Sequence, residues 1–172
     1  MNIYGVIGKP LVHSKSPSIF NSYFKSLNMD SEYILLENTY ENVELLVKSI
    51  KERNILGFNV TIPYKENIMR YLDDIDKTAI EIGAVNCVVK ENGILKGYNT
   101  DFYGFVKSLE NEDVDISGKS ALVFGTGGAA RAICFGLASL GIKKVTLYGR
   151  NQERAEVLLK SLQSLEQFEI KL

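Results

Sequence analysis

The stretch Ala121-Leu-Val-Phe-Gly125-Thr-Gly127-Gly128-Ala-Ala-Arg131-Ala132 decides how the second half of this chain folds. Four apolar residues predict a buried strand, the glycines a tight turn, and the apolar residues through Leu140 a helix. Glycine at the turn permits the sharp bend and lets backbone N–H groups approach a pyrophosphate, whose charge the helix N-terminus stabilises. This strand–turn–helix context favours a dinucleotide site over a plain tight turn. The residues predicted to bind the dinucleotide here are Gly125, Thr126, Gly127, Gly128 and Ala129.

A second strand at 144–148 completes a βαβ unit, and Gly149-Arg150-Asn151 follows it. A site that prefers NAD usually carries an acidic residue at this point, which accepts the ribose hydroxyls. A guanidinium instead suits a 2′-phosphate, so the sequence predicts NADP as cofactor, with Arg150, Asn151 and Arg154 as contacts. For Arg154, pairing with a nearby glutamate on a solvated helix explains the residue equally well. A helix at 152–165 and the beginning of a third strand at 168–172 continue the pattern of a Rossmann domain.

Strands and helices alternate through the first half of the chain. Strands are expected at 2–7, 33–36 and 57–63, helices at 16–27 (with Ser16 as N-cap) and 43–53, and short helical stretches ending near 71 and 80. Glu91-Asn92-Gly93 predicts a hairpin turn between strands at 84–89 and 94–98, and a helix at 101–109 capped by Asn99 or Thr100 follows. The predicted fold class is α/β: a mostly parallel substrate domain at 1–110, then the first part of a Rossmann NADP-binding domain at 111–172.

Composition excludes several classes of function. The chain has 172 residues, 45% of them hydrophobic, and a formal net charge of -1, so no overall field attracts nucleic acid or an anionic membrane. No run approaches the roughly 20 apolar residues of a membrane span, and the N-terminus lacks a basic leader, which predicts a cytoplasmic protein. Cys87 and Cys134 are expected to be buried thiols, and a single histidine, His13, disfavours a zinc site; no metal is predicted.

Polar residues cluster where the predicted strands of the first domain end, which is where open α/β sheets bind ligands. The segments are 8–16, 59–65, Asn86 and 99–101, rich in hydroxyls and amides and including Lys65 and Asp101. Such groups suit a small polyhydroxylated substrate, and a lysine–aspartate pair suits proton transfer. The residues alone therefore predict an NADP-linked enzyme acting on a small polar molecule. Helix capping by Ser16 or Asn99, and solvent exposure of Asn59 and Thr61, are the simpler explanations for the same residues.

Five motifs, taken in order, resemble the signature motifs of the shikimate dehydrogenase family, from residue 5 to about 155. They are Gly8-Lys-Pro-Leu-Val-His-Ser14-Lys-Ser16-Pro17, Gly57-Phe-Asn59-Val-Thr61-Ile-Pro63-Tyr-Lys65, Gly83-Ala-Val-Asn86, Gly97-Tyr-Asn99-Thr-Asp101 and the glycine turn at 125–131. The resemblance implies NADPH-dependent, reversible reduction of 3-dehydroshikimate to shikimate, in aromatic amino-acid biosynthesis through chorismate.

The resemblance also implies roles for individual residues. Ser14 and Ser16 would bind the substrate carboxylate, while Thr61, Asn86 and Asp101, supported by Asn59, would contact the ring hydroxyls. Lys65 would donate and accept the proton at the carbonyl, with Asp101 orienting it. An ammonium suits this task, because hydride delivery to a ketone builds negative charge on oxygen. His13 is given no chemical role.

Two departures from the family pattern qualify this interpretation. Gly149 stands where the family often has asparagine, which weakens the expected selectivity for NADP. The chain also ends at Leu172, in at most the third strand of a six-stranded fold, so we expect a fragment with little activity alone. An incomplete domain would expose a sheet edge and apolar helix faces, predicting self-association or disorder after about residue 120.

Other hypotheses remain open at this point. One is a non-catalytic module that binds shikimate or quinate, and another is a subunit of a split enzyme. Among enzymes, a quinate/shikimate dehydrogenase is the nearest rival, although the acidic residue it would favour at the ribose site is absent. Methylenetetrahydrofolate dehydrogenase, with its related two-domain plan, ranks lower.

Overall fold

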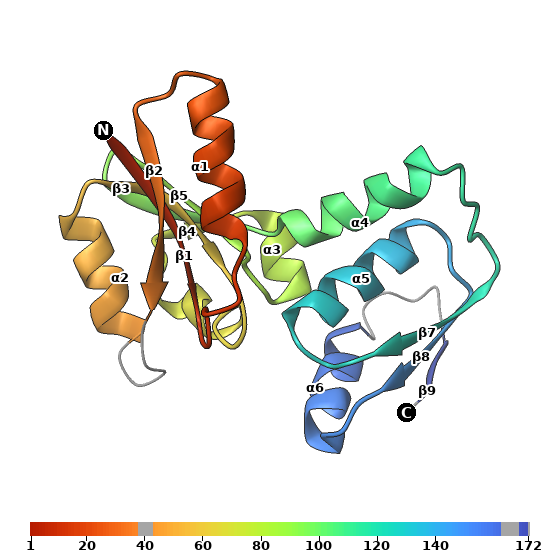
Figure 1. Ribbon diagram of the computed structural model, residues 1–172. Helices are drawn as coiled ribbons and strands as arrows, with labels where there is room; N and C mark the ends of the chain where they lie inside the picture. The colour runs from red at the N-terminus through yellow and green to blue at the C-terminus, as the bar shows by residue number, and fades with distance from the viewer. Residues whose placement is uncertain (38–42, 163–168, 172) are drawn as a thin grey trace. The chain divides into compact units, whose positions relative to one another are not determined.

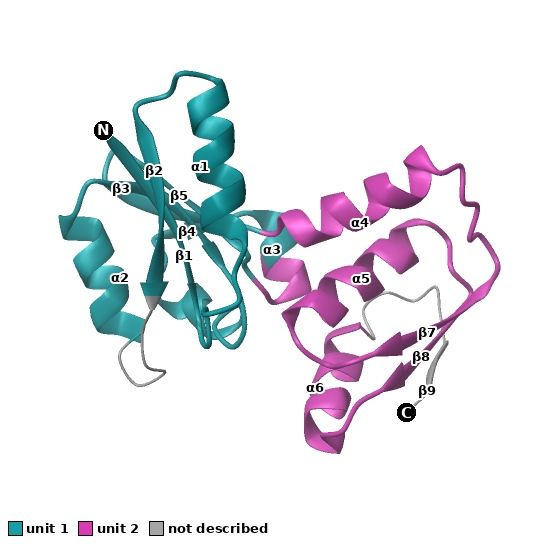
Figure 2. Ribbon diagram, viewed as in Figure 1, with its two compact units in different colours: residues 1–79, 85–98 teal, residues 80–84, 99–172 magenta. Residues whose placement is uncertain are grey.

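The computed structural model describes residues 1–37, 43–162 and 169–171, and packing divides the chain into two compact units (Figure 2). Unit 1 comprises Met1–Ala79 and Val85–Tyr98, and unit 2 comprises Ile80–Ala84 and Asn99–Leu172. The boundary expected near residue 110 lies later than this division. Helix α4 (Thr100–Asn111) belongs to unit 2 because it packs against helix α5 (Gly128–Ser139).

Unit 1 is built on a six-stranded sheet in the order β2-β1-β3-β5-β6-β4 (Figure 1). Its strands are β1 (Asn2–Gly8), β2 (Ser31–Glu37), β3 (Ile55–Val60), β4 (Asp74–Ile75), β5 (Cys87–Glu91) and β6 (Ile94–Tyr98). β1 runs parallel to β2 and β3, and β4 is parallel to β6, whereas β5 is antiparallel to both its neighbours. The expected parallel sheet with an antiparallel hairpin is therefore confirmed; the short edge strand β4 was not expected.

The helices of unit 1 are α1 (Ser16–Ser26), α2 (Val43–Glu52), the 3₁₀ helix η2 (Asn67–Tyr71) and the beginning of α3 (Lys77–Ile82). Successive side chains of a strand point to opposite faces, so neighbouring β1 residues enter different cores. Ile7 lies in the large cluster that includes Val47 and Ile50 of α2, and Val6 lies in a smaller one with Phe24 of α1. The sheet thus buries apolar side chains on both faces.

The structure confirms the predicted hairpin turn and the predicted cap of α4, but not the predicted cap of α1. The predicted hairpin turn has Asn92 and Gly93 at φ 51° and 81°, the left-handed values that a two-residue hairpin turn needs. Asn99 caps α4, its side chain accepting a hydrogen bond from the backbone N–H of Phe102 at 3.2 Å. Ser16, however, is the first helical residue of α1 rather than its N-cap. The N-cap is Lys15, which makes no side-chain capping hydrogen bond, and the Ser16 N–H donates to the Ser14 Oγ at 3.4 Å.

Unit 2 contains a parallel sheet of β7 (Ser120–Phe124), β8 (Lys144–Tyr148) and β9 (Glu169–Lys171), in that order. Helices α5 and α6 (Gln152–Leu162) contribute most of its core, and Leu158 and Leu162 of α6 are fully buried. Leu122, Phe124 and Tyr148 of β7 and β8 are exposed, and so are Tyr103 of α4 and Val157 of α6. Self-association through this unit stays a prediction.

Close contact between α4 and α5 depends on one glycine. A Cβ atom at Gly136 would lie 2.6 Å from the Phe105 ring, so only glycine lets the two helices approach this far. Of the two cysteines, both free thiols, Cys134 is buried in α5, and burial raises its pKa to about 12. Cys87 is half-buried at the start of β5, because its side chain faces a cavity described below.

None of the described helices combines the length and the apolar character needed to cross a membrane. Within the same residues, no group of three or more histidine, cysteine, aspartate or glutamate side chains could hold a metal ion.

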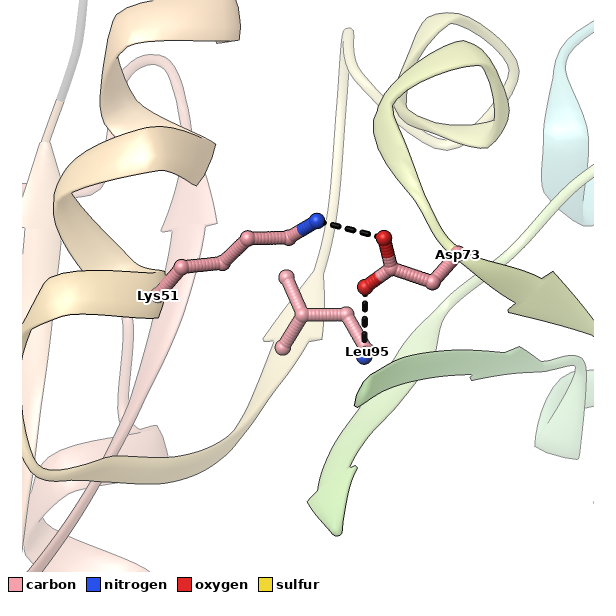
Figure 3. A network of polar contacts seen from close by, with 3 residues as sticks. All are labelled: Lys51, Asp73 and Leu95. Carbon is pink, nitrogen blue, oxygen red and sulfur yellow. Dashed lines mark hydrogen bonds and ion pairs between the residues drawn. The ribbon is translucent and has the colours of Figure 1, made fainter. Parts of the chain in front are cut away.

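Asp73 links three segments of unit 1 (Figure 3). One carboxylate oxygen pairs with the Lys51 ammonium of α2 at 2.5 Å, and the other accepts the Leu95 N–H of β6 at 2.9 Å. The Asp73 N–H in turn donates to the Leu95 carbonyl at 3.0 Å. The backbone hydrogen bond first, and then Lys51, lower the pKa of the Asp73 carboxyl.

Replacing Asp73 by alanine should destabilise the chain by about 1–2 kcal/mol near neutral pH, because the Leu95 N–H and Lys51 lose their partner. The lowered pKa means that this stability is complete above the ordinary carboxyl value of about 3.9 and is lost as the pH falls through the folded-state value. Urea denaturation of wild type and Asp73→Ala at several pH values measures both effects. Asp74→Ala is the matched control, since Asp74 makes an exposed ion pair with Lys96; an equal loss in both variants would contradict the prediction.

Candidate functional site

The predicted site residues fall into two groups, one in each unit. In unit 1 the backbone joins the segments that follow β1 and β3: the Thr61 N–H donates to the Ile7 carbonyl and the Lys9 N–H to the Ile62 carbonyl, both at 2.9 Å. A Cβ atom at Gly8 would collide with the Thr61 methyl group, so glycine is required where the two segments touch. Thr61 is thereby held beside the loop that leads to Ser14 and Ser16.

The first loop is anchored by one buried side chain. Leu11 is 2% exposed, and its carbonyl accepts the Ser14 N–H at 2.9 Å, closing a turn. Ser14 and Ser16 are half-buried, the first before α1 and the second in its first turn. Both hydroxyls therefore lie at the N-terminal end of a helix, where a carboxylate is electrostatically favoured.

Asn86 joins the remaining predicted residues of unit 1. Its backbone carbonyl accepts the Val60 N–H at 2.8 Å and the Asn59 side-chain amide at 3.4 Å. The preceding residue, Val85, donates its N–H to the Lys65 carbonyl at 2.8 Å. Asn59, Thr61, Lys65 and Asn86 are consequently carried by adjoining backbone segments. Asn86 itself is 8% exposed, so a polar side chain is held in an almost dry position.

One residue of this network was missed by the sequence analysis. The hydroxyl of Tyr33, on β2, donates to the Asn59 Oδ1 at 2.7 Å. Burial first, and Cys87 second, raise the pKa of this phenol far above its ordinary value, while a side-chain hydrogen bond from Ser16 acts in the opposite direction. The only available signal was a tyrosine in an otherwise apolar strand, because a buried tyrosine hydroxyl usually has a partner.

A cavity of about 290 Å³ lies beside Tyr33 and Asn59, between α1 and the sheet. Its walls are mainly apolar and include Phe20, Phe24 and Val89, and Cys87 also lines it. Of the residues predicted to bind substrate, Asn59 alone is among the side chains that line it. The cavity is therefore separate from the place where the other predicted contacts gather.

Lys65 and Asp101 lie in different units. Lys65 follows β3 in unit 1, whereas Asp101 lies in the first turn of α4 in unit 2. The start of α4 is secured within its own unit by the Asn99 amide, which donates to the Ala84 carbonyl at 2.9 Å. The pairing of Lys65 with Asp101 stays a prediction.

The glycine turn of unit 2 has the form that the sequence predicts. Gly125 has φ 111°, a left-handed value that favours glycine, and its N–H donates to the Tyr148 carbonyl at 2.8 Å. A Cβ atom at Gly125 or Gly127 would meet no heavy atom within 4 Å, so open space lies over the turn. Gly128 and Ala129 begin α5 there. A helix N-terminus that follows a strand and faces open space can bind an anionic group such as a pyrophosphate.

The neighbouring strand end carries the predicted ribose-phosphate contacts. Arg150 and Arg154 are both exposed, and Arg154 lies in the first turn of α6. Asn151 has a structural role, since its side-chain oxygen accepts the Arg154 N–H at 2.9 Å and so caps α6. Gly149 makes room for the glycine turn: a Cβ atom there would lie 2.5 Å from the Thr126 methyl carbon. The glycine at 149 is thus matched to the threonine at 126.

These features define a class of protein: an α/β unit with polar residues gathered at its strand ends, and a βαβ unit with a dinucleotide-type turn. Comparison with known proteins narrows the class. The family model of the shikimate dehydrogenase substrate binding domain matches residues 6–88. A shikimate dehydrogenase (NADP(+)) of Caldanaerobacter subterraneus subsp. tengcongensis is 46% identical over 169 residues, 98% of this chain and 60% of that protein.

Solved structures of shikimate dehydrogenases are also similar to this chain. The shikimate dehydrogenase of Aquifex aeolicus has a TM-score of 0.90 and 39% identity, covering 100% of this chain and 63% of that one. The Thermus thermophilus enzyme, crystallised with NADP(H) and shikimate, has a TM-score of 0.85 and 31% identity, over 99% and 63% of the two chains. The chain is therefore similar to shikimate dehydrogenases over almost its whole length, and to the substrate binding domain of that family over residues 6–88. The chain spans about 60% of the length of the Caldanaerobacter subterraneus protein.

The contact between Gly149 and Thr126 can be tested by paired substitutions. Gly149→Ala should destabilise unit 2 by about 1–3 kcal/mol, because the new methyl group overpacks against a stiff, β-branched neighbour. Combining it with Thr126→Ala removes the opposing methyl group and should recover most of that loss, as measured by thermal unfolding. Thr126→Ala alone is the reference, and a double variant no more stable than Gly149→Ala would contradict the steric explanation.

Proposed function

We propose that this chain carries the shikimate-binding unit and the NADP phosphate-binding turn of a shikimate dehydrogenase, which interconverts 3-dehydroshikimate and shikimate. The observation that carries the proposal is a set of hydrogen bonds in unit 1 that holds the segments of Asn59, Lys65 and Asn86 together, with Thr61 bonded to Ile7 where β1 and β3 end. Their amide, hydroxyl and ammonium groups match a hydroxylated ring bearing a carbonyl. The similar proteins are named for this activity and cofactor, which supports the same assignment here.

Each group of unit 1 has a defined task in this proposal. Ser14 and Ser16, at the start of α1, bind the substrate carboxylate. Thr61 and Asn86, with Asp101 of unit 2, bind the ring hydroxyls, and Asn59 supports them. Lys65 protonates the carbonyl oxygen during reduction and recovers the proton during oxidation, with Asp101 orienting its ammonium. A positively charged donor is suited to this step because the oxygen becomes negative as the carbonyl is reduced.

Unit 2 fits a dinucleotide at two places. The open space over Gly125 and Gly127, together with the N-terminus of α5, accommodates a pyrophosphate, and the exposed guanidinium groups of Arg150 and Arg154 suit a 2′-phosphate. Bound NADP supplies the hydride chemistry of the family. The residues of this chain bind and orient the cofactor phosphates, and the capping role of Asn151 keeps the first turn of α6, and with it Arg154, in place.

Lys65→Met tests the proposed chemistry. It should abolish turnover of shikimate with NADP while changing the shikimate affinity by less than about tenfold, because Lys65 acts mainly in the transition state. Steady-state kinetics and calorimetric titration with shikimate measure the two effects. Lys48→Met is the control, since Lys48 is an exposed lysine of α2 that pairs with Glu44.

Each outcome of this experiment has a definite meaning. If Lys65→Met turns over shikimate at the wild-type rate, Lys65 is not the proton donor. Binding of shikimate by the wild-type chain without measurable turnover agrees with the weak activity expected of this chain alone, and also with a binding module or a subunit of a split enzyme. A wild-type chain that binds neither shikimate nor NADP overturns the proposal as a whole.

Arg150→Ala tests the choice of cofactor. Losing a charge-assisted contact to the 2′-phosphate should weaken NADP binding about 10- to 100-fold and leave NAD binding nearly unchanged. Calorimetric titration with each dinucleotide gives the comparison, and Arg154→Ala shows whether the second guanidinium contributes. An equal loss for NADP and NAD would show that Arg150 does not contact the 2′-phosphate.

A further inference from the structure

We propose that Tyr33 is a positioning residue of the substrate site, because its hydroxyl sets the orientation of the Asn59 side-chain amide. The inference rests on the proposed function and adds a residue to it. Tyr33 is 3% exposed and belongs to β2, two strands away from β3, which carries Asn59. Its hydroxyl reaches across β1 to the Asn59 Oδ1 at 2.7 Å.

The orientation of the Asn59 amide follows from what its two neighbours can do. The Asn86 backbone carbonyl can only accept, so the Asn59 nitrogen must face it, at 3.4 Å. The Asn59 oxygen then faces Tyr33, and the phenol must be the donor. Tyr33 and Asn86 together therefore select one of the two amide orientations, and the second N–H of Asn59 points in a single direction.

Tyr33 is itself held firmly enough to perform this task. The Asn21 side chain of α1 forms two hydrogen bonds with the Tyr33 backbone, one to the carbonyl at 3.0 Å and one from the N–H at 2.8 Å. The Phe20 ring stacks on the Tyr33 ring, with centroids 4.4 Å apart and an interplanar angle of 7°. The phenol is thus confined by backbone, ring and hydroxyl contacts, as an effective positioning group must be.

The network also reaches the proposed carboxylate contacts. Ser16 lies close enough to the Tyr33 hydroxyl to lower the pKa of the phenol, against the larger effect of burial. Ser16 and Asn59 are both proposed to touch substrate, one near the carboxylate and the other near the ring hydroxyls. Tyr33 is therefore bonded to Asn59 and lies near Ser16, close to both parts of the proposed site.

The test is calorimetric titration of the whole chain with shikimate. Tyr33→Phe, which keeps the ring and removes the hydroxyl, should weaken binding about 3- to 10-fold, the equivalent of one lost intramolecular hydrogen bond. Tyr4→Phe is the matched control, because Tyr4 lies opposite Tyr33 on β1 and lines the same cavity. It should leave the affinity unchanged.

A double-mutant cycle separates positioning from general structural support. If Tyr33 acts through Asn59, the Tyr33→Phe substitution should have no further effect on shikimate binding in an Asn59→Ala background. A loss of the same size in both backgrounds would overturn the proposal, as would unchanged binding by Tyr33→Phe. A wild-type chain that does not bind shikimate overturns the proposed function, and this inference with it.

A second measurement does not depend on the folding of Tyr33→Phe. In the wild-type chain, the NMR signals of the Asn59 side-chain amide should shift when shikimate saturates the site, since the oriented N–H faces the ligand. Amide signals that stay in place at saturation would overturn the proposal even if the variant fails to fold.

Discussion

The close approach of the segments after β1 and β3 is the constraint on which the first unit depends. Two backbone hydrogen bonds join these segments beyond the last paired residues of the sheet, and glycine at position 8 is needed for them to touch. Because parallel strands end at the same edge, any residue just past either strand is brought to that edge. Ser14 and Thr61, far apart in the sequence, are both near it for this reason.

A second set of hydrogen bonds converges on Asn86. Its carbonyl holds the end of β3 and the Asn59 amide, and the residue before it holds the Lys65 carbonyl. A buried polar group is costly unless it is hydrogen-bonded, so the Asn86 carbonyl stabilises the site by accepting from both the backbone and the Asn59 amide. The Tyr33 hydroxyl extends the same arrangement to a third strand. In unit 2 the analogous contact is steric: Gly149 lies against Thr126, which brings the second strand end beside the glycine turn.

Much of the fold could be predicted because the signals are local. Asn92-Gly93 prefers left-handed φ values and forms the hairpin turn, and Asn99 caps the helix that follows it. The two-residue strand β4 carried too little pattern to be recognised. Ser16 was misplaced by one position, because α1 begins after Lys15, a residue without a capping side chain, and the serine before Pro17 gave the stronger local signal. The packing of α4 on α5 could not be predicted, because it depends on a glycine distant in sequence.

The sequence by itself determined the order of strands and helices, the glycine turn and the types of residue at the strand ends, since each depends on neighbours along the chain. It also carried the family resemblance, because the motifs are continuous stretches. Only the tertiary structure decided which polar groups meet. Tyr33 and Asn59 are joined across an intervening strand, and Gly149 and Thr126 across two strand ends. Contacts of this kind depend on sheet order and register, which hydrophobic pattern and local turn chemistry leave open.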